Sequence, residues 1–255
     1  MSDAPWTLRA ADYDDERVSR AAESRSVAVV IPARDEEATL GAVLEAVGDF
    51  GDLEEVVVVD DHSHDGTAAV ARRHGARVVT LEGTPGKGAA LRAGARATTS
   101  ELLVFLDADV VNTTREFVGR LLQPLLEEPR IHLVKGYYQR PLGDQPFGGG
   151  RVTELTARPI LALLFPDLRE IRQPLAGETA LRRSVLDVID LEHTYGVEIA
   201  LLIDVARRFG VGSLAQVDLG VRRHRNRPLE ELRPMAGEVL RAALLRFGIE
   251  LPPAD

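Results

Sequence analysis

The sequence of 255 residues contains no cysteine. This absence excludes disulfide frameworks, metal sites built on thiolates, and reactions that use a thiol nucleophile. An excess of basic residues is also missing, because 31 Lys and Arg stand against 40 Asp and Glu and give a formal net charge of -9. Nucleic acid binding depends on basic residues that meet phosphates, so we expect no nucleic acid partner. Any anionic ligand must then be held by a local basic patch or a metal ion.

Long apolar runs are absent as well. The N-terminal segment, residues 1–25, is charged and has no apolar run followed by a small-residue cleavage site, so it is typical of neither a signal peptide nor a membrane anchor. Runs elsewhere, such as residues 56–59, fall far below the ~20 residues that a membrane span needs. We therefore expect a cytoplasmic protein with no membrane partner, while peripheral contact with a membrane surface stays open.

Short β-branched runs alternate with helical periodicity between Ser26 and Asp109. This alternation predicts an α/β fold, with a mainly parallel sheet flanked by helices, whose ligands bind just past the carboxyl ends of the strands. The expected strands are 27–31, 56–59, 77–81 and 102–106, and the expected helices are 38–47, 67–74 and 88–97.

The rhythm changes after about Pro141, where a Gly/Pro-rich segment begins. The cluster of three glycines at 148–150 is too short to link independent domains, and no internal repeat is present. We therefore expect a single domain with two halves, residues 26–140 and 141–255. In the second half the expected helices are 151–164, 196–209 and 229–247, and the expected strands are 177–182 and most of 211–221.

Two carboxylates follow the fourth expected strand directly, in Asp107-Ala108-Asp109. Carboxylates on alternate residues at a strand end can reach one hard cation, and Mg²⁺ or Mn²⁺ prefers oxygen ligands and often bridges to substrate phosphates. A D-x-D sequence is common in surface turns, but the apolar strand before it favours a metal site.

Two further acidic clusters follow the first and second strands. They read Pro32-Ala33-Arg34-Asp35-Glu36-Glu37 and Asp60-Asp61-His62-Ser63-His64-Asp65-Gly66. Taken alone, Glu36 and Glu37 would complement the N-terminus of the next helix, and Asp65-Gly66 would be a turn. Because all three acidic clusters follow strands of one sheet, we expect them to converge on one edge.

In this order, the three clusters resemble the nucleotide-binding half of the GT-A glycosyltransferases, over about residues 27–109. In that superfamily the first two segments hold the nucleoside, and the D-x-D motif holds the ribose and the metal-bridged diphosphate. The resemblance implies a GT-A type, Rossmann-like fold. It also implies donor contacts from Pro32, Ala33, Arg34, Glu36, Asp61, Asp107 and Ala108.

The glycine-rich segment 83–88 is not a Walker A loop. Leu81 stands where the first glycine belongs, and Gly88 stands where Ser or Thr would bind Mg²⁺. We expect Lys87 to reach the donor nucleotide from a helix N-terminus, a place that favours anions. The structural alternative is an exposed lysine in a turn.

Four segments of the second half are similar to those of the glucosyl-3-phosphoglycerate synthases. These are retaining enzymes that transfer glucose from UDP-glucose to 3-phosphoglycerate. The resemblance then extends to about Phe247 and implies that residues 26–140 bind the nucleotide sugar and the smaller half, 141–255, binds the acceptor. The segments read GGGRVTEL from Gly148, QPLAGE from Gln173, YGVEI from Tyr195 and VRRHRNRPL from Val221.

This family resemblance implies an acceptor site for a phosphate and a carboxylate at Arg151, Thr153 and the backbone of Gly150, with Ala176 and Tyr195 beside them. A planar guanidinium can bind an oxyanion bidentately, which suits Arg151. The structural alternative for Arg151 is a solvated start of a helix.

The resemblance also makes His224 the metal ligand that joins Asp109. Because Mg²⁺ prefers oxygen, the sequence alone would make His224 only a phosphate neighbour. Arg222 is a candidate contact for the diphosphate. Glu198 either lies by the transferred sugar, where it stabilises positive charge at the anomeric carbon, or is a first-turn glutamate that complements a helix dipole.

Two features depart from the family pattern. The extension after the last helix is nearly absent, which would weaken the interface of the homodimer that we expect. His62 and His64 replace smaller residues in the second nucleotide loop, which would alter base preference.

We therefore expect metal-dependent transfer of glucose from UDP-glucose to 3-phosphoglycerate with retention, using Mg²⁺ or Mn²⁺. Asp109 and Glu198 are the expected catalytic residues, and the departing phosphate is the expected proton acceptor. Three alternatives stay open: synthesis of mannosyl-3-phosphoglycerate from GDP-mannose, a non-catalytic nucleotide-sugar-binding module, and a transferase acting on polyprenyl phosphate at a membrane surface. For the last, only residues 229–247 offer a partial amphipathic platform.

Overall fold

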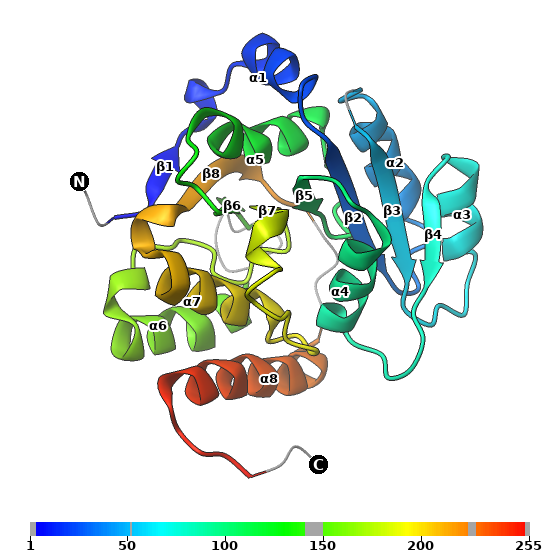
Figure 1. The fold of residues 1–255 in the computed structure, drawn as a ribbon. Helices are drawn as coiled ribbons and strands as arrows, with labels where there is room; N and C mark the ends of the chain where they lie inside the picture. Colours follow the sequence, from blue (N-terminus) through cyan, green and yellow to red (C-terminus); the bar gives the residue numbers. More distant parts are fainter. Residues whose placement is uncertain (1–3, 52, 141–149, 224–227, 253–255) are drawn as a thin grey trace.

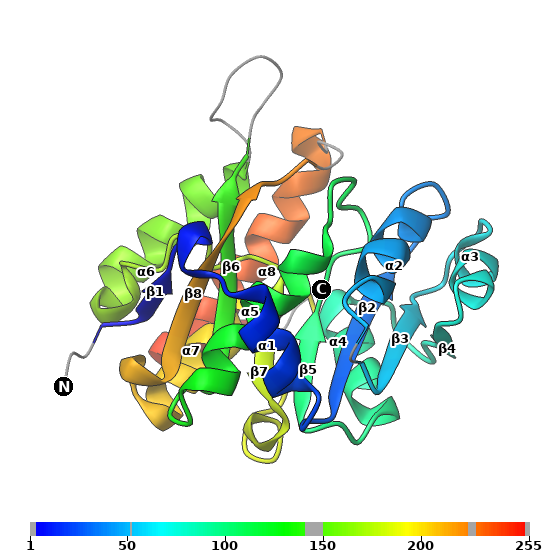
Figure 2. The same ribbon diagram turned by 90° about the horizontal axis from the view of Figure 1, so that it is seen from above.

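The computed structural model describes residues 4–51, 53–140, 150–223 and 228–252. In these residues one eight-stranded sheet has the order β1-β8-β6-β7-β5-β2-β3-β4, and helices cover both of its faces (Figures 1 and 2). The strands are β1 (Trp6–Leu8), β2 (Val27–Ala33), β3 (Glu55–Asp60), β4 (Arg77–Thr80), β5 (Leu102–Phe105), β6 (Leu133–Gln139), β7 (Thr179–Arg182) and β8 (Leu214–Val221). The α-helices are α1 (Asp15–Ala22), α2 (Leu40–Gly48), α3 (Thr67–Arg73), α4 (Lys87–Ala97), α5 (Arg115–Glu127), α6 (Arg158–Leu164), α7 (Val197–Phe209) and α8 (Leu229–Phe247).

The first half forms the parallel part of the sheet that its sequence pattern predicts. Strand β2 lies between β3 and β5, and all three run parallel. Every residue of β2 except Pro32 is buried, because helices pack on both faces of the strand. Ala33 pairs with Asp60 and Val30 with Phe105, so the three strands end at the same edge.

The second half completes the same sheet. Strand β7 is antiparallel to β5 and β6, whereas β8 is parallel to β6. The helix predicted over residues 151–164 is present, with a π-helical stretch at Thr153–Ala157 before α6. Residues 211–213 form a 3₁₀ turn, and the strand predicted in this region begins at Leu214. Helix α5 and strand β6 have no counterpart in the sequence prediction.

The N-terminal segment also contributes to the sheet. Strand β1 pairs in parallel with β8 at one edge, and α1 packs on α5 with Val18 and Ala22 buried. The sequence pattern predicts neither element, because β1 has only three residues and α1 has only two buried positions.

Two apolar cores lie on opposite faces of the sheet. Alternate residues of β2 divide between them, with Val29 and Ile31 in the first core and Ala28 and Val30 in the second. The first core joins the sheet to α1, α2, α3 and α5, and the second joins it to α4, α6, α7 and α8. Among the described residues, no helix combines the length and apolar character required to cross a bilayer.

Candidate active site

A cavity of about 210 Å³ lies past the carboxyl ends of β2, β3 and β5, where ligands of parallel α/β sheets bind. Seventeen residues are predicted above to contact the donor, the acceptor or the metal or to act in catalysis, and fifteen of them line the wall of this cavity. The exceptions are Ala176, which is buried beside the cavity, and His224, which lies outside the described residues. The lining residues are Pro32, Ala33, Arg34, Glu36, Asp61, Lys87, Asp107, Ala108, Asp109, Arg140, Gly150, Arg151, Val152, Thr153, Leu175, Tyr195, Glu198, Arg222, Leu232, Met235 and Val239.

The loops after β2 and β3 hold each other in place. Asp35, in left-handed backbone at φ 54°, accepts a 2.7 Å hydrogen bond from the backbone N–H of His64. Glu37 accepts one of 3.0 Å from the N–H of Gly66, and the N–H of Glu36 donates to the Thr67 hydroxyl at 2.9 Å. Part of the acidic character of these loops is therefore structural, because Asp35 and Glu37 bind loop backbone.

Asp61 is the buried acid of the second loop. Its Oδ2 accepts a 3.2 Å hydrogen bond from the N–H of Gly86, and its Oδ1 lies 3.0 Å from Nδ1 of His62. His62 has φ 60°, in the left-handed region that few non-glycine residues adopt. The carboxylate that lines the donor side of the cavity is thus oriented from both sides.

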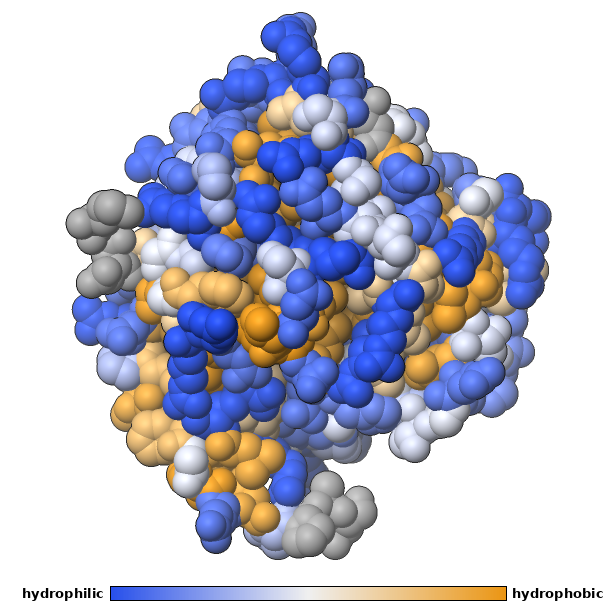
Figure 3. Space-filling view, in the orientation of Figure 1, coloured by the Kyte–Doolittle hydropathy of each residue, from blue (hydrophilic) through white to orange (hydrophobic). Residues whose placement is uncertain are grey.

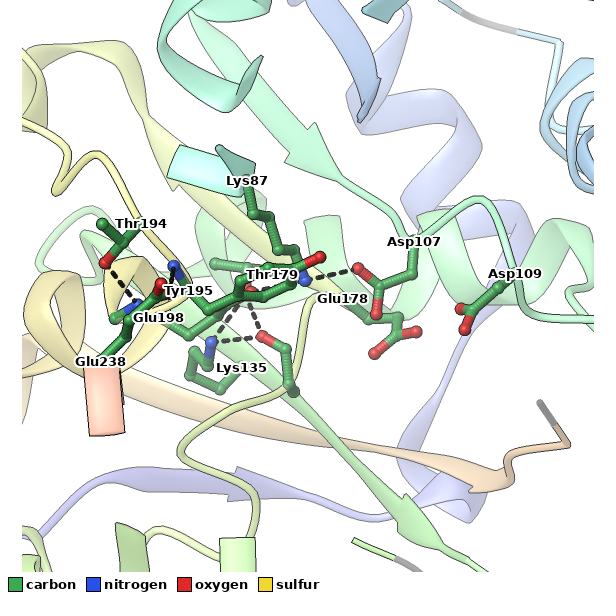
Figure 4. Close-up of polar contacts among 12 residues, drawn as sticks. Lys87, Asp107, Asp109, Lys135, Glu178, Thr179, Thr194, Tyr195, Glu198 and Glu238 are labelled. Atoms are coloured by element: carbon green, nitrogen blue, oxygen red, sulfur yellow. Dashed lines mark hydrogen bonds and ion pairs between the residues drawn. The ribbon is translucent and has the colours of Figure 1, made fainter. Parts of the chain in front are cut away.

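Lys87 bridges two carboxylates from different parts of the chain (Figure 4). Its Nζ lies 2.7 Å from Oδ1 of Asp107 and 2.5 Å from Oε1 of Glu198, and all three side chains are less than a fifth exposed. Helix α4 begins at Lys87, so this lysine lies at a helix N-terminus and lines the cavity, while its contact with the donor stays a prediction. The exposed-turn alternative is wrong.

Arg222 draws three carboxylates together. Its NH2 lies 2.6 Å from Oδ2 of Asp107 and 3.1 Å from Oδ1 of Asp109, and its Nε lies 3.0 Å from Oε1 of Glu178. The side chains of Arg222 and Glu178 are 4% and 1% exposed. Lys87, Asp107 and Arg222 therefore form a continuous ion-pair chain along the cavity wall.

The charges in this chain shift the pKa values of its members. Burial would raise the pKa of Asp107, but the attraction of Lys87 and Arg222 lowers it well below its usual range. Burial would lower the pKa of Lys87, but Asp107 and Glu198 raise it above its usual value. The site therefore keeps Asp107 negative and Lys87 positive at neutral pH.

Two glycines allow this close packing. A Cβ at Gly177 would overlap the carboxylate of Asp107, and a Cβ at Gly88 would overlap the carbonyl of Glu192. The second approach lets the N–H of Ala89 donate to the carbonyl of His193 at 2.9 Å. This contact fixes the start of α4 against the segment that leads to Tyr195.

The same cavity is also lined by residues predicted for the acceptor. Gly150, Arg151 and Thr153 lie where the chain enters the π-helical stretch, which frequently occurs at functional sites. Thr153 is buried at the cavity wall. The backbone N–H of Tyr195 donates to Oε2 of Glu238 in α8 at 2.8 Å, so α8 holds the backbone at Tyr195 in place.

Asp109 and Asp107 offer hard oxygen ligands of the kind that Mg²⁺ and Mn²⁺ bind. The side chain of Asp109 is 22% exposed at the cavity, so its carboxylate can reach a ligand. Within the described part of the chain, no three His, Asp or Glu side chains are placed to hold an ion by themselves. A metal held here would thus need oxygen atoms from a substrate or a ligand outside these residues. The donor set fits a divalent cation bound together with a diphosphate.

Three charged residues of the site are absent from the sequence prediction. Glu178 pairs with Arg222, Lys135 lies beneath the cavity, and Arg140 lines it. The guanidinium of Arg140 lies 4.9 Å from the ring centre of Tyr138 and donates to its hydroxyl at 2.7 Å. The only available signal was the position of Glu178 in the QPLAGE segment, because Lys135 and Arg140 belong to no quoted motif.

The chain is similar to known proteins over most of its length. The chain is 42% identical to the glucosyl-3-phosphoglycerate synthase of Mycolicibacterium smegmatis, over 98% of this chain and 86% of that protein. It is 45% identical to the enzyme of the same name from Mycobacterium tuberculosis, over 88% of this chain and 74% of that protein. The synthase from Petrotoga mobilis is 39% identical over 87% of this chain and 73% of that protein.

Solved structures match the whole fold. The Mycobacterium tuberculosis synthase in complex with Mn²⁺, uridine-diphosphate-glucose and phosphoglyceric acid superposes with a TM-score of 0.90 at 40% identity, covering 98% of this chain and 89% of that one. Its complex with Mg²⁺ and uridine diphosphate gives 0.89 at 41% identity, covering 96% and 88%. The family model for glycosyl transferase family 2 matches residues 28–190. The fold is therefore the GT-A fold, and the chain belongs to glycosyl transferase family 2.

Proposed function

We propose that the chain transfers glucose from UDP-glucose to 3-phosphoglycerate with retention of configuration and in dependence on a divalent cation. One observation carries this proposal: a single cavity is lined both by the D-x-D residues, with Lys87 and Arg222, and by Arg151 and Thr153. The related synthase has been solved with UDP-glucose and phosphoglyceric acid together. The division into a donor half, residues 26–140, and an acceptor half, residues 141–255, is part of this proposal.

The donor end suits a nucleoside diphosphate. Asp61 and Glu36, on the two interlocked loops, can accept hydrogen bonds from a base or ribose. Asp109 and Asp107 would hold Mg²⁺ or Mn²⁺ together with the diphosphate, and we expect His224 to join them. The cation, when bound, neutralises charge on the leaving diphosphate. Lys87 and Arg222 add fixed positive charge beside the same oxygens.

The acceptor end suits a small molecule with two anionic groups. Arg151 and Arg140 supply guanidinium groups, and Thr153 supplies a hydroxyl. Two guanidinium groups at one end of a cavity can bind a phosphate and a carboxylate separately. This end thereby orients the acceptor hydroxyl toward the sugar.

In the transfer, the bond between the anomeric carbon and the β-phosphate oxygen breaks while the acceptor hydroxyl oxygen bonds to the same carbon. The hydroxyl proton passes to the departing phosphate, so no protein base is required. Glu198 lies in the cavity wall with its carboxylate on Lys87, where it can stabilise positive charge at the anomeric carbon.

An assay with the purified chain tests this function. We expect Mn²⁺-dependent release of UDP from UDP-glucose only when 3-phosphoglycerate is present, and a product with the anomeric configuration of the donor by NMR. A panel with GDP-mannose and ADP-glucose measures donor preference. A clear preference for GDP-mannose would refute the glucose assignment, and binding without turnover would favour a non-catalytic module.

Arg151→Ala is expected to raise the KM for 3-phosphoglycerate about 30-fold, because the loss of a charge-assisted contact costs on the order of 2 kcal/mol. The KM for UDP-glucose should stay near the wild-type value. Arg158→Ala is the matched control. Arg158 is an exposed arginine in the same helical segment as Arg151, and it pairs with Glu154. An unchanged KM for 3-phosphoglycerate would remove Arg151 from the acceptor site.

We also propose that two copies of the chain associate through the outer faces of α6 and α8. Apolar residues gather on this side of the molecule (Figure 3), where Leu163 is 80% exposed and Phe247 47%. Such exposed apolar area is typical of an interface. Light scattering after size exclusion is expected to give twice the chain mass for the wild type and one chain mass for Leu163→Glu. A monomeric wild type would contradict the homodimer.

We also propose that the protein is cytoplasmic, as predicted above. Cell fractionation tests this location.

A further inference from the structure

The sequence contains only two lysines, Lys87 and Lys135, among its 31 lysines and arginines. Arginine supplies every other basic side chain, yet both lysines are at the candidate active site. Lys87 lines the cavity, and Lys135 lies beneath it in β6, 1% exposed. An ammonium is compact, whereas a guanidinium is broad and planar, so the two residues are not interchangeable in a closely packed interior.

The buried ammonium of Lys135 has only neutral partners. Its Nζ donates to the carbonyl of Ala176 at 2.5 Å and to the hydroxyl of Thr179 at 2.9 Å (Figure 4). Among the described residues, no carboxylate lies within ion-pair distance of it. Burial of a charge without an ion-pair partner is costly. A methionine of similar length would avoid this cost, so stability alone does not account for a lysine here.

Both hydrogen bonds of Lys135 go to one short segment that forms part of the site. The N–H of Ala176 donates to the carbonyl of Gln173 at 3.1 Å, which closes a turn that brings Leu175 to the cavity. Two residues further along, Glu178 pairs with Arg222. Lys135 therefore anchors the backbone between a wall residue and the ion-pair chain.

The charge of Lys135 also faces the acidic groups of the cavity. The charged groups around it are Glu198, on α7, Lys87, on α4, Glu178, just before β7, and Asp107, after β5. Burial lowers the pKa of Lys135 to about 8, while Glu198 acts in the opposite direction. The ammonium is thus present at neutral pH and is lost as the pH rises through about 8.

We propose that Lys135 is a positioning residue for the transfer reaction: its ammonium fixes the turn at Ala176, which lies between Leu175 of the cavity wall and Glu178. This inference rests on the function proposed above. Lys135 is not among the residues that line the cavity. Its loss should therefore slow transfer without weakening the hold on UDP, which the loops after β2 and β3 provide.

The kinetic test compares Lys135→Met with Thr179→Val and with Arg130→Met, an exposed control just before β6. We expect Lys135→Met to lower kcat by about 10- to 100-fold, because a small displacement of the reacting groups slows the reaction by this order. The affinity for UDP with Mn²⁺, measured by calorimetry, should stay within about threefold of the wild-type value. Thr179→Val keeps the charge but removes one hydrogen bond of Lys135 and the 3.1 Å bond from the Thr179 hydroxyl to the carbonyl of Ala176. It should lower kcat by about threefold. A wild-type kcat in folded Lys135→Met, or a loss of UDP binding equal to the loss of kcat, would overturn the proposal.

The pH profile separates positioning by charge from mere packing. The wild-type kcat should fall as the pH rises through about 8, while kcat of Lys135→Met should stay low across this range without that step. If Lys135→Met does not fold, the pH profile of the wild type and the kcat of Thr179→Val test the role of Lys135 instead. A wild-type kcat that stays constant to pH 10 would refute the role of the charge.

A second measurement does not depend on turnover. Protein labelled with ¹³Cε-lysine should give two lysine signals, and Lys135→Met assigns them. We expect the Lys135 signal to titrate near pH 8 and its midpoint to fall in Glu198→Gln, because a neighbouring negative charge has been removed. A midpoint near 10.4, the value of a solvated lysine, or one that Glu198→Gln does not move, would contradict the inference. A wild type without transfer activity would refute the proposed function instead. The titration would still test whether the ammonium of Lys135 has the expected midpoint and responds to Glu198.

Discussion

Asp109→Ala is expected to lower kcat/KM for glucosyl transfer by about 10³-fold and to raise the Mn²⁺ concentration needed for half-maximal rate. Loss of one group that stabilises developing charge typically costs 10²- to 10³-fold, and a metal ligand adds the loss of the cation itself. Asp109 is placed for this role by β5, which ends two residues before Asp107, and its carboxylate reaches both the cavity and Arg222. Rates at several Mn²⁺ concentrations give both quantities.

His224 is the second half of this test, because we expect it to bind the same ion as Asp109. It lies outside the described residues, but the carbonyl of Arg223, immediately before it, accepts a 3.1 Å hydrogen bond from the N–H of Val111, two residues after Asp109. His224→Ala should also raise the Mn²⁺ concentration needed for half-maximal rate. The loss of activity in the double variant should be much smaller than the sum of the two single losses, expressed as free energies. Asp187→Ala, an exposed carboxylate outside the cavity, is the control. A wild-type Mn²⁺ dependence in His224→Ala would assign His224 to phosphate binding instead.

Lys87→Met is expected to lower kcat/KM about 100-fold, because it removes the cation between Asp107 and Glu198. Both carboxylates would then be left poorly solvated, and breaking a buried ion pair on one side typically costs about 3–5 kcal/mol. The variant should therefore also unfold at lower temperature than the wild type. Arg96→Met, an exposed basic residue on the same helix, controls for the loss of one positive charge. Wild-type turnover in Lys87→Met would show that Lys87 contacts only protein carboxylates and not the donor.

The same variant has a predicted pH signature. In the wild type, Asp107 has a lowered pKa, so its ion pairs stabilise the fold above the usual pKa of about 3.8 and this contribution is lost as the pH falls below that value. Lys87→Met removes much of the contribution. The difference in unfolding free energy between the two proteins should thus be largest near neutral pH and shrink on acidification. A difference that is independent of pH would mean that Lys87 acts through packing alone.

The donor side of the site could be predicted from sequence because its residues follow strands. An apolar run of four or five residues identifies a buried strand, and polar residues directly after such a run must lie at the carboxyl edge of the sheet. Glu36, Asp61 and Asp107 were found in this way, and each lines the cavity. The acceptor residues Arg151 and Thr153 have no such local signal. They were predicted only through the family resemblance.

Lys135, Glu178 and Arg140 show why the rest of the site could not be predicted. Glu178 stands just before a short strand and Lys135 inside one, where a pattern search expects residues of the core or surface. Arg140 follows β6, which the sequence prediction lacks altogether. Their roles depend on which strands become neighbours, and β7 inserts antiparallel between β5 and β6.

The amino-acid sequence by itself determined the alternation of strands and helices in the first half and the acidic loops at their ends, because both follow from local apolar periodicity and from the residues that interrupt it. Only the tertiary structure decided the partners of the charged side chains. Lys87 pairs with Glu198, 111 positions away, and Arg222 with Asp107, 115 positions away. Such ion pairs form where folded backbones happen to bring side chains together in a poorly solvated cavity, and no local preference of the chain encodes that distance.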